Sequence, residues 1–327
     1  MSRGLSIGLV GAGQIGQVYL EILRAVEGAH LVAVADNNPD TAAAAAEAYG
    51  VDGYASVEEM LRGAETEAAV VCTPPASHAE IALECLRRGI HVLCEKPLAL
   101  SCAEAEALVR TAEEKAALLM MASKFRYVPE VMKAKGVIAA GALGEVISFE
   151  NAFCSHVDMR RRWNSVPEVS GGGVIIDNGA HSADIARYLL NPIGEVLVAQ
   201  GPGAQDVEVE ETTCILVKTV SGVLGVIQLS WSYNRHLDSF ISVYGASGTL
   251  HVGWKGMRYR VVDKPDWVEF GNGYNKMEAI RAQVLNFVRS IQGVERPLMT
   301  PDDALASVKV VDAAYRSLAS SRWESVR

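Results

Sequence analysis

The chain has 327 residues, half of them hydrophobic, which is enough for a large buried core and for two domains. Its 39 acidic residues outnumber 30 Lys and Arg and give a formal net charge of −9, so no nucleic-acid partner is expected, because surfaces that bind nucleic acids are basic. No apolar run approaches the ~20 residues of a membrane-spanning helix, so no membrane association is expected.

The first apolar run, Leu5 to Val10, is short and ends in a glycine loop. A signal peptide is therefore not expected, and the protein is predicted to be cytoplasmic. The six cysteines lack the paired spacing that holds a metal ion, and several lie in apolar stretches. We interpret them as reduced core residues and predict no metal site.

Up to residue 123, short apolar runs alternate with helical stretches, which is the pattern of a parallel α/β sheet. Strands and helices are expected in turn at residues 6–10, 14–26, 31–35, 39–49, 68–72, 77–88, 91–94, 103–117 and 118–122. The sequence therefore predicts an α/β protein with an N-terminal Rossmann domain, the doubly wound fold that binds dinucleotides, over residues 1–123.

From residue 124 to residue 327 the runs become longer and β-like, and several alternate in polarity. Strands are expected at residues 146–153, 196–200, 211–219, 223–232, 240–244 and 249–252, and helices at 128–139, 180–190, 278–292 and 302–320. Alternation of this kind predicts an α+β domain with a large, mostly antiparallel open sheet and helices on one face. The last helix is placed to pack back toward the first domain.

A glycine loop, Gly11-Ala12-Gly13-Gln14-Ile15-Gly16, follows the first predicted strand. This spacing permits a tight turn, lets the backbone approach a pyrophosphate and allows close helix packing. Asp36 ends the second predicted strand, where a carboxylate binds the ribose hydroxyls of NAD and repels the 2′-phosphate of NADP. Asn37 and Asn38 offer that phosphate no positive charge, so NAD is predicted over NADP. Cofactor contacts are expected from Gly11, Gly13, Gln14, Ile15, Asp36 and Asn37; the alternative is that the glycines only form a turn.

Two further loops follow predicted strands and so fall at the same carboxyl edge of the sheet, where ligands bind in this fold. In the loop from Thr73 to His78, the candidate cofactor contacts are Thr73, Pro74 and His78, with a surface helix position as the alternative for His78. Glu95-Lys96-Pro97 supplies a lysine that can donate a proton to a carbonyl or stabilise an alkoxide. We predict that Glu95 and Lys96 contact the cofactor and that Lys96 is catalytic; the alternative is a solvated lysine paired with Glu95.

Three glycines at residues 171–173, which indicate a backbone that passes close to a ligand, precede Asp177 and His181. Asp177 and His181 are four residues apart and share a face if the segment is helical. A carboxylate beside an imidazole fixes its tautomer, which suits a general base, so both residues are predicted to be catalytic. The alternatives are a helix-capping Asp with a buried His, or a metal pair, for which no further clustered ligands are found.

The predicted substrate contacts are Arg126, Tyr127, Arg162, Trp163 and Asn178. Phe125-Arg126-Tyr127 lies at the predicted domain junction. The basic cluster Arg160-Arg161-Arg162 could bind a carboxylate, a phosphate or a diphosphate, and Trp163 could stack on a sugar. The alternative is a solvated basic run with one anchored aromatic.

Taken in order, these motifs resemble those of the Gfo/Idh/MocA oxidoreductases over essentially the whole chain. The resemblance implies a tightly held nicotinamide near Lys96 and a second domain whose open sheet often forms an oligomer interface. It matches Lys96 to the motif lysine of the family, and Asp177 and His181 to the acid and histidine that contact sugar hydroxyls. The chain departs from many members in lacking an Asn or Gln before Phe125-Arg126.

The sequence thus predicts an NAD-dependent oxidoreductase that transfers hydride between nicotinamide and a secondary hydroxyl or ketone of a cyclic sugar or polyol. A homo-oligomer, a dimer or tetramer, is expected. Two alternatives stay open: a sugar-nucleotide 3-dehydrogenase or ketoreductase, of which an NAD-assisted glycoside-cleaving enzyme is a variant, and an NAD-binding sensor without turnover.

Overall fold

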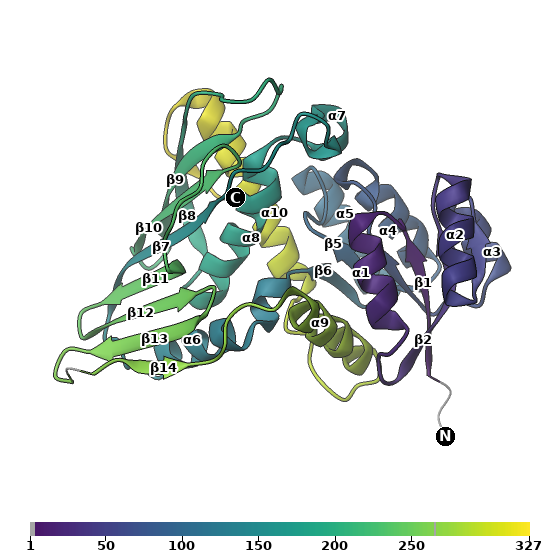
Figure 1. The fold of residues 1–327 in the computed structure, drawn as a ribbon, viewed down its shortest axis with the longest axis horizontal. Helices are drawn as coiled ribbons and strands as arrows, with labels where there is room; N and C mark the ends of the chain where they lie inside the picture. The colour runs from purple at the N-terminus through teal and green to yellow at the C-terminus, as the bar shows by residue number, and fades with distance from the viewer. Residues whose placement is uncertain (1–3, 265) are drawn as a thin grey trace. The chain divides into compact units, whose positions relative to one another are not determined.

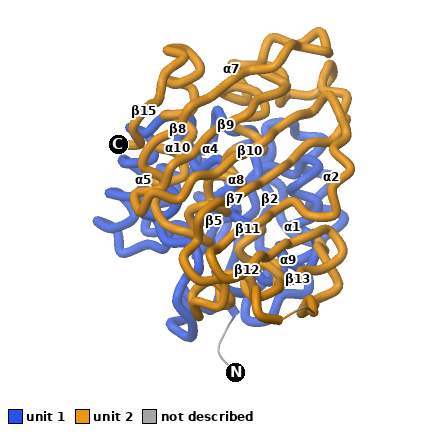
Figure 2. The backbone as a smooth tube through the Cα atoms, turned by 90° about the vertical axis from the view of Figure 1, so that its left-hand side faces the viewer, with its two compact units in different colours: residues 1–124, 276–305 blue, residues 125–275, 306–327 orange. Residues whose placement is uncertain are grey.

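The computed structural model describes residues 4–264 and 266–327, which form two compact units (Figures 1 and 2). The first unit contains the chain up to residue 124 together with residues 276–305, and the second contains residues 125–275 and 306–327. Residues 276–305, which were expected in the second domain, belong to the first unit because the helix they form packs against the first helix of the chain.

The first unit is built on six parallel strands in the order β3-β2-β1-β4-β5-β6, which confirms the predicted Rossmann sheet. The strands are β1 (Leu5–Val10), β2 (Ala29–Ala35), β3 (Asp52–Tyr54), β4 (Ala68–Val71), β5 (His91–Glu95) and β6 (Leu119–Ala122). Every residue of β1, β4 and β6 is buried, as expected for strands covered on both faces. The sequence missed β3 because its three residues contain no apolar run.

The helices of the first unit are α1 (Gln14–Leu23), α2 (Pro39–Tyr49), α3 (Val57–Gly63), α4 (His78–Arg87), α5 (Cys102–Glu114) and α9 (Lys276–Ile291). Helix α2 is capped at its start by Asn38, whose side chain accepts hydrogen bonds from the backbone amides of Asp40 and Thr41. It is followed by Gly50, whose φ of 68° is in the left-handed region that favours glycine. These local signals explain why the sequence predicted its bounds.

The second unit is built on a nine-stranded sheet in the order β14-β13-β12-β11-β7-β10-β9-β8-β15. The strands are β7 (Val146–Cys154), β8 (Ile193–Gln200), β9 (Thr212–Thr219), β10 (Leu224–Ser230), β11 (Ser239–Gly245), β12 (Gly248–Gly253), β13 (Gly256–Val261), β14 (Val268–Phe270) and β15 (Glu324–Ser325). Only the β7–β10 pair is parallel among these described strands, which confirms the predicted, mostly antiparallel sheet. The last three strands were missed.

The helices that accompany this sheet are α6 (Pro129–Ala139), α7 (Pro167–Ser170), α8 (Val174–Leu189) and α10 (Pro301–Ser320). Helices α8 and α10 supply Ala183 and Val310 to a core that includes Ile215, Val217 and Ile227 of the sheet. Figure 2 shows the strands of this unit from the side opposite to these helices. The sheet is therefore open on one face, as predicted.

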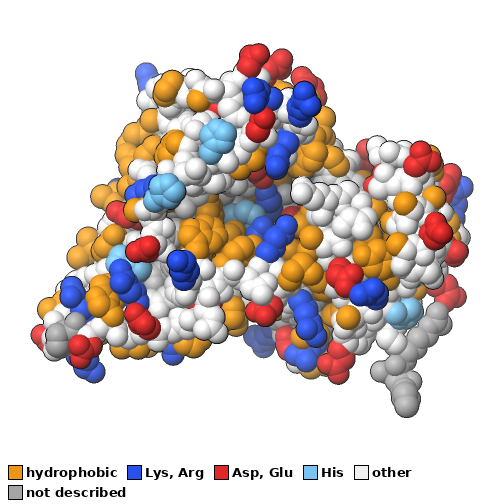
Figure 3. All heavy atoms as spheres, in the orientation of Figure 1, with side chains coloured by type: hydrophobic (Ala, Val, Ile, Leu, Met, Phe, Trp, Pro, Cys, Tyr) orange, Lys and Arg blue, Asp and Glu red, His pale blue; other side chains and the backbone are white. Residues whose placement is uncertain are grey.

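Acidic and basic side chains are interspersed over the face of the molecule shown in Figure 3, so neither sign of charge dominates it. Of the helices described, none has both the length and the apolar character needed to cross a bilayer.

Candidate active site

Four loops of the first unit meet at one edge of its sheet. Strands β2, β1, β4 and β5 are neighbours and parallel, so their carboxyl ends point the same way. The glycine loop follows β1, Asp36 follows β2, Thr73 follows β4, and Lys96 follows β5. The fold thus gathers the predicted cofactor residues at the edge where ligands bind in doubly wound sheets.

The glycine loop is open at Gly13, where an anion could bind, and is too tightly packed at Gly11 and Gly16 to accept a side chain. A Cβ on Gly11 (φ 92°) would lie 2.8 Å from the backbone of Cys72, and one on Gly16 would lie 2.0 Å from the carbonyl oxygen of Gly11. Gly13 is exposed, and nothing lies within 4 Å of its Cβ position. It precedes α1 without a side-chain cap, and the first turn has no acidic residue. This loop therefore fits the pyrophosphate of a dinucleotide.

Asp36 is oriented by two backbone amides. Its Oδ2 accepts a hydrogen bond from the Ala12 amide at 2.8 Å, and its Oδ1 accepts one from the Asn38 amide at 2.9 Å. The carboxylate is half-buried beside the glycine loop, with Asn37 exposed next to it. Of the other predicted cofactor residues here, Gln14 is exposed and Ile15, Thr73, Pro74, Glu95 and Lys96 are half-buried.

His78 is a bridge between two loops rather than a surface contact. It is fully buried, and its Nδ1 lies 2.7 Å from the carbonyl oxygen of Pro97 while its Nε2 lies 2.8 Å from that of Thr73. Burial lowers the pKa of His78, and the two carbonyl contacts oppose that shift. The predicted cofactor contact by His78 does not fit this burial, because both ring nitrogens already face the backbone. Its ring instead joins the Thr73 loop to the loop that carries Lys96.

Glu95 is held by a network that the sequence did not reveal. The Tyr19 hydroxyl donates to Glu95 Oε1 at 2.8 Å, and Gln283 of α9 donates to the Tyr19 oxygen at 2.9 Å. The other carboxylate oxygen, Oε2, accepts from the Lys96 backbone amide at 3.1 Å. Tyr19 and Gln283 are fully buried, and burial together with the charge of Glu95 raises the pKa of Tyr19, so its hydroxyl stays a donor.

We expect Tyr19→Phe to destabilise the protein by about 1–3 kcal/mol, because it leaves a carboxylate oxygen of Glu95 without its buried donor. The free energy of unfolding from denaturant titration measures this loss. Gln283→Leu should cost much less in the Tyr19→Phe background than alone, because both side chains act in one network. Strictly additive losses would contradict the coupling.

Helix α8 begins at residue 174 rather than at 180, which brings Asp177 into its first turn. Gly173 provides no side-chain cap, and Glu210 takes that role: its carboxylate oxygens accept from the amides of Gly173 and Ile175, each at 3.0 Å. The Tyr315 hydroxyl also donates to Glu210 at 2.8 Å. The sequence missed this cap because its carboxylate lies 37 residues away from Gly173.

Two of the three glycines before α8 serve the packing of the protein. A Cβ on Gly173 would lie 2.1 Å from the Glu210 carbonyl oxygen, and one on Gly172 would lie 1.9 Å from the Tyr315 hydroxyl. The interpretation that this backbone passes close to a ligand is therefore corrected at these two positions: the close neighbours are Glu210 and Tyr315.

Asp177 and His181 both lie on α8, one turn apart, as their spacing suggested. His181 is 7% exposed, and its ring meets the ring of Phe125 edge-on, with centroids 5.1 Å apart. Asp177 and Asn178 are half-buried. The helix thus presents a carboxylate and an imidazole together, a pair that can orient and move one proton.

Arg126 forms a buried ion pair with Asp184. Its Nε lies 2.9 and 3.0 Å from the two carboxylate oxygens of Asp184, and its Nη2 lies 2.6 Å from Oδ1. The two side chains are 4% and 0% exposed. The predicted substrate contact by Arg126 does not fit this geometry, because Asp184 already takes its charge. Tyr127 is buried as well, at 5% exposure.

Arg162 and Trp163 are both exposed, just ahead of the short α7 helix, and their role stays a prediction. The neighbouring Arg160 pairs with Asp158 at 2.8 Å, so part of the charge of this basic cluster is already compensated. In the part of the chain that the structure describes, no group of three or more His, Cys, Asp or Glu side chains could hold a metal ion.

Comparisons with known proteins identify the family and agree with the fold. A model of an oxidoreductase family with an NAD-binding Rossmann fold (GFO_IDH_MocA) matches residues 5–123, and a model of the GFO/IDH/MocA C-terminal domain matches residues 131–251. Inositol 2-dehydrogenase of Rhizobium meliloti is 29% identical over 98% of this chain and 98% of its own length. D-apiose dehydrogenase of Paraburkholderia graminis is 26% identical over 96% of this chain and 88% of its own.

A solved structure of levoglucosan dehydrogenase in complex with NADH has the same fold, with a TM-score of 0.92 at 21% identity over 99% of this chain and 100% of that one. The first family model matches the Rossmann domain, and the second matches the part of the chain that follows it. The chain therefore belongs to the Gfo/Idh/MocA family of NAD-binding oxidoreductases.

Proposed function

We propose that this protein is an NAD-dependent dehydrogenase that transfers hydride between nicotinamide and a secondary hydroxyl of a cyclic sugar or polyol. The observation that carries the proposal is the grouping of Lys96 with the glycine loop and Asp36 at one edge of the parallel sheet. Relatives named inositol 2-dehydrogenase and D-apiose dehydrogenase, both similar to nearly the whole chain, support the substrate class.

Lys96, Asp177 and His181 each have one role when the substrate alcohol is oxidised. His181 takes the proton of the substrate hydroxyl, and Asp177 on the same helix face orients its imidazole. Lys96 stabilises the negative charge that develops on the substrate oxygen. Bound NAD supplies the hydride acceptor, so a secondary alcohol and NAD⁺ become a ketone, NADH and a proton. In the reductive direction Lys96 or His181 returns the proton.

The first test is the absorbance of NADH at 340 nm, with purified protein and NAD or NADP against inositols, aldoses, sugar acids and anhydrosugars. Formation of NADH with a member of this panel is the expected result. Turnover only with UDP- or dTDP-sugars would favour the sugar-nucleotide enzyme. Tight NAD binding without turnover of any substrate would favour the sensor.

We expect Asp36→Ala to shift the cofactor preference from NAD toward NADP. The carboxylate sits beside the glycine loop and repels a 2′-phosphate there, and its removal also deletes the acceptor for the ribose hydroxyls. The ratio of kcat/KM for NAD to that for NADP should fall by about tenfold or more, which corresponds to about 1.4 kcal/mol. A wild-type protein that already prefers NADP would contradict the role given to Asp36.

Self-association through the open face of the nine-stranded sheet is also proposed. Leu216 and Leu224, which lie on the neighbouring strands β9 and β10, are 37% and 56% exposed, and exposed apolar side chains of this kind favour burial against another copy.

A further inference from the structure

Five aromatic rings of the second unit form one connected cluster, and it ends at the surface. Its members are Phe125, Phe153, Phe240, Trp254 and Tyr274. The three phenylalanines are buried, with exposed fractions of 9% or less. Trp254 packs on Phe240 with centroids 4.5 Å apart and is nevertheless 43% exposed. Large apolar side chains that pack on buried residues and expose one side to solvent are a common feature of ligand sites.

The cluster connects this exposed surface to His181. Phe125 meets the His181 ring edge-on at 5.1 Å and stacks on Tyr274 at 5.3 Å. Tyr274, half-buried, meets Trp254 in a T-shaped contact at 5.7 Å. A continuous series of ring contacts therefore links the proposed base to Trp254 within one folded unit, without depending on the placement of the other unit.

The loop that carries Tyr274 is fixed in place. The Tyr274 amide donates to the Trp254 carbonyl oxygen at 3.1 Å, and the Gly273 amide donates to Glu130 Oε1 at 2.7 Å. Glu130 is a buried carboxylate, 2% exposed. Gly273 has a φ of 98°, and a Cβ there would lie 2.1 Å from the Trp254 carbonyl oxygen. Burial of a carboxylate to hold a surface loop indicates that the position of Tyr274 is pre-organised.

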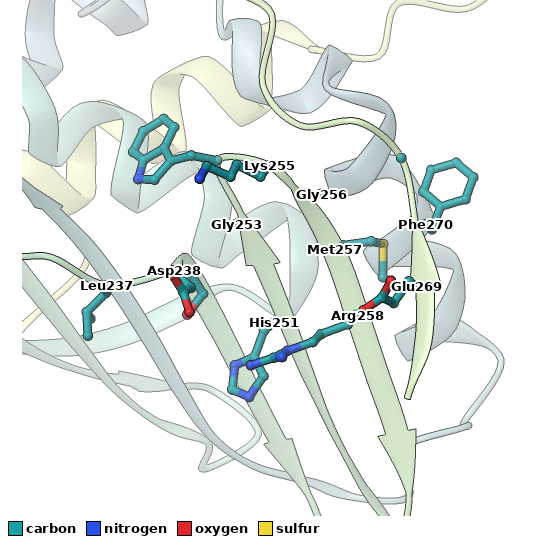
Figure 4. A pocket seen from close by; sticks show the side chains of 13 residues that line it. Leu237, Asp238, His251, Gly253, Lys255, Gly256, Met257, Arg258, Glu269 and Phe270 are labelled. Carbon is teal, nitrogen blue, oxygen red and sulfur yellow. The ribbon is translucent and has the colours of Figure 1, made fainter. Parts of the chain in front are cut away.

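Trp254 also borders open space. It lines a pocket of about 380 Å³ whose other walls come from β12, β13 and β14 and from the segment before β11 (Figure 4). This volume falls within the range of small-molecule pockets. Of the aromatic cluster, Trp254 is the member that lines this pocket, so the open space lies beside that ring.

We propose that Trp254 and Tyr274 form a stacking surface for the apolar face of the substrate ring. A ring sugar has hydroxyls around its edge and C–H bonds on its faces, so one molecule can hydrogen-bond His181 and lay a face on an aromatic ring. The enzyme then selects cyclic sugars with an uninterrupted C–H face over epimers that place a hydroxyl in that face. This inference rests on the proposed function and narrows its substrate class.

Kinetics of Trp254→Ala and Trp254→Phe, with the best sugar of the NADH panel and an epimer of it, test the proposal. Trp254→Ala should raise KM for the preferred sugar by about tenfold with kcat changed less than about twofold, and should erase most of the discrimination against the epimer. Trp254→Phe should restore most of the affinity, since a smaller ring still stacks. An unchanged KM in Trp254→Ala, or no recovery in Trp254→Phe, would overturn the proposal.

Tryptophan fluorescence separates this proposal from the proposed function. Titration with the same sugars should quench emission in the wild type, and Trp254→Phe should remove most of that change although the other four tryptophans, Trp163 among them, remain. His181→Ala should abolish turnover and keep the quenching. Quenching without turnover in the wild type would refute the dehydrogenase and leave the stacking surface standing; turnover without quenching would refute the stacking surface alone.

Discussion

Lys96→Met is expected to lower kcat by about 10²–10⁴-fold, because the methionine side chain can neither donate a proton nor carry positive charge beside the substrate oxygen. The backbone around Lys96 is fixed independently of its side chain: its amide donates to Glu95, and the carbonyl oxygen of Pro97 contacts the His78 ring. Binding of NADH, measured by fluorescence titration, should therefore stay within a few-fold of the wild type.

Two further variants sharpen this expectation. Lys96→Arg keeps the positive charge but offers a guanidinium that does not release its proton, so it should recover part of kcat for oxidation, which needs the charge, and little of kcat for reduction if Lys96 is the proton donor there. Lys115→Met removes an exposed lysine at the end of α5 and should leave kcat unchanged. Near-normal turnover of Lys96→Met on a proven substrate would remove Lys96 from the mechanism.

The parts of this site that the sequence predicted all follow from local rules. Glycines at positions 11 and 16 are required by close backbone contacts around one strand–turn–helix, so their spacing, together with Asp36 at the end of the second strand, indicates the loop. Asp36 and Lys96 could be placed at one edge of the sheet because the carboxyl ends of parallel strands coincide. Asp177 and His181 share a helix face by their spacing alone.

The parts that the sequence missed depend on contacts between distant segments. Gln283 reaches Tyr19 across 264 residues, and no local pattern distinguishes a buried glutamine on an apolar helix face from an exposed one. Arg126 was predicted to be a substrate ligand because it lies at the domain junction, where a substrate cleft is expected, and the local sequence does not show its partner. Its partner, Asp184, is 58 residues away and became visible only with the packing of α8.

Removal of one side chain of the ion pair between Arg126 and Asp184 should destabilise the protein more than loss of the Tyr19 hydroxyl does. Asp184→Ala leaves a guanidinium in a site where the two side chains are 4% and 0% exposed, and it removes all three short contacts at once. Breaking a buried pair from one side costs about 3–5 kcal/mol, because the remaining charge stays buried and loses its carboxylate partner. Denaturant titration of the free energy of unfolding measures this cost.

The double variant Arg126→Met, Asp184→Leu distinguishes two causes of destabilisation: the loss of attraction between the two charges, and the burial of one charge that has lost its carboxylate partner. It removes both charges and keeps apolar volume, so it should be clearly more stable than Asp184→Ala. The exposed pair of Arg160 and Asp158 provides the matched control: Arg160→Ala should leave the unfolding midpoint unchanged, because water screens and solvates both charges there. If the double variant were as unstable as Asp184→Ala, the cost would come from the mutual attraction and packing of the two side chains. The stability of this unit would then depend on the ion pair itself. Arg126 would contribute to stability through its bond to Asp184, instead of being a buried charge that Asp184 only neutralises.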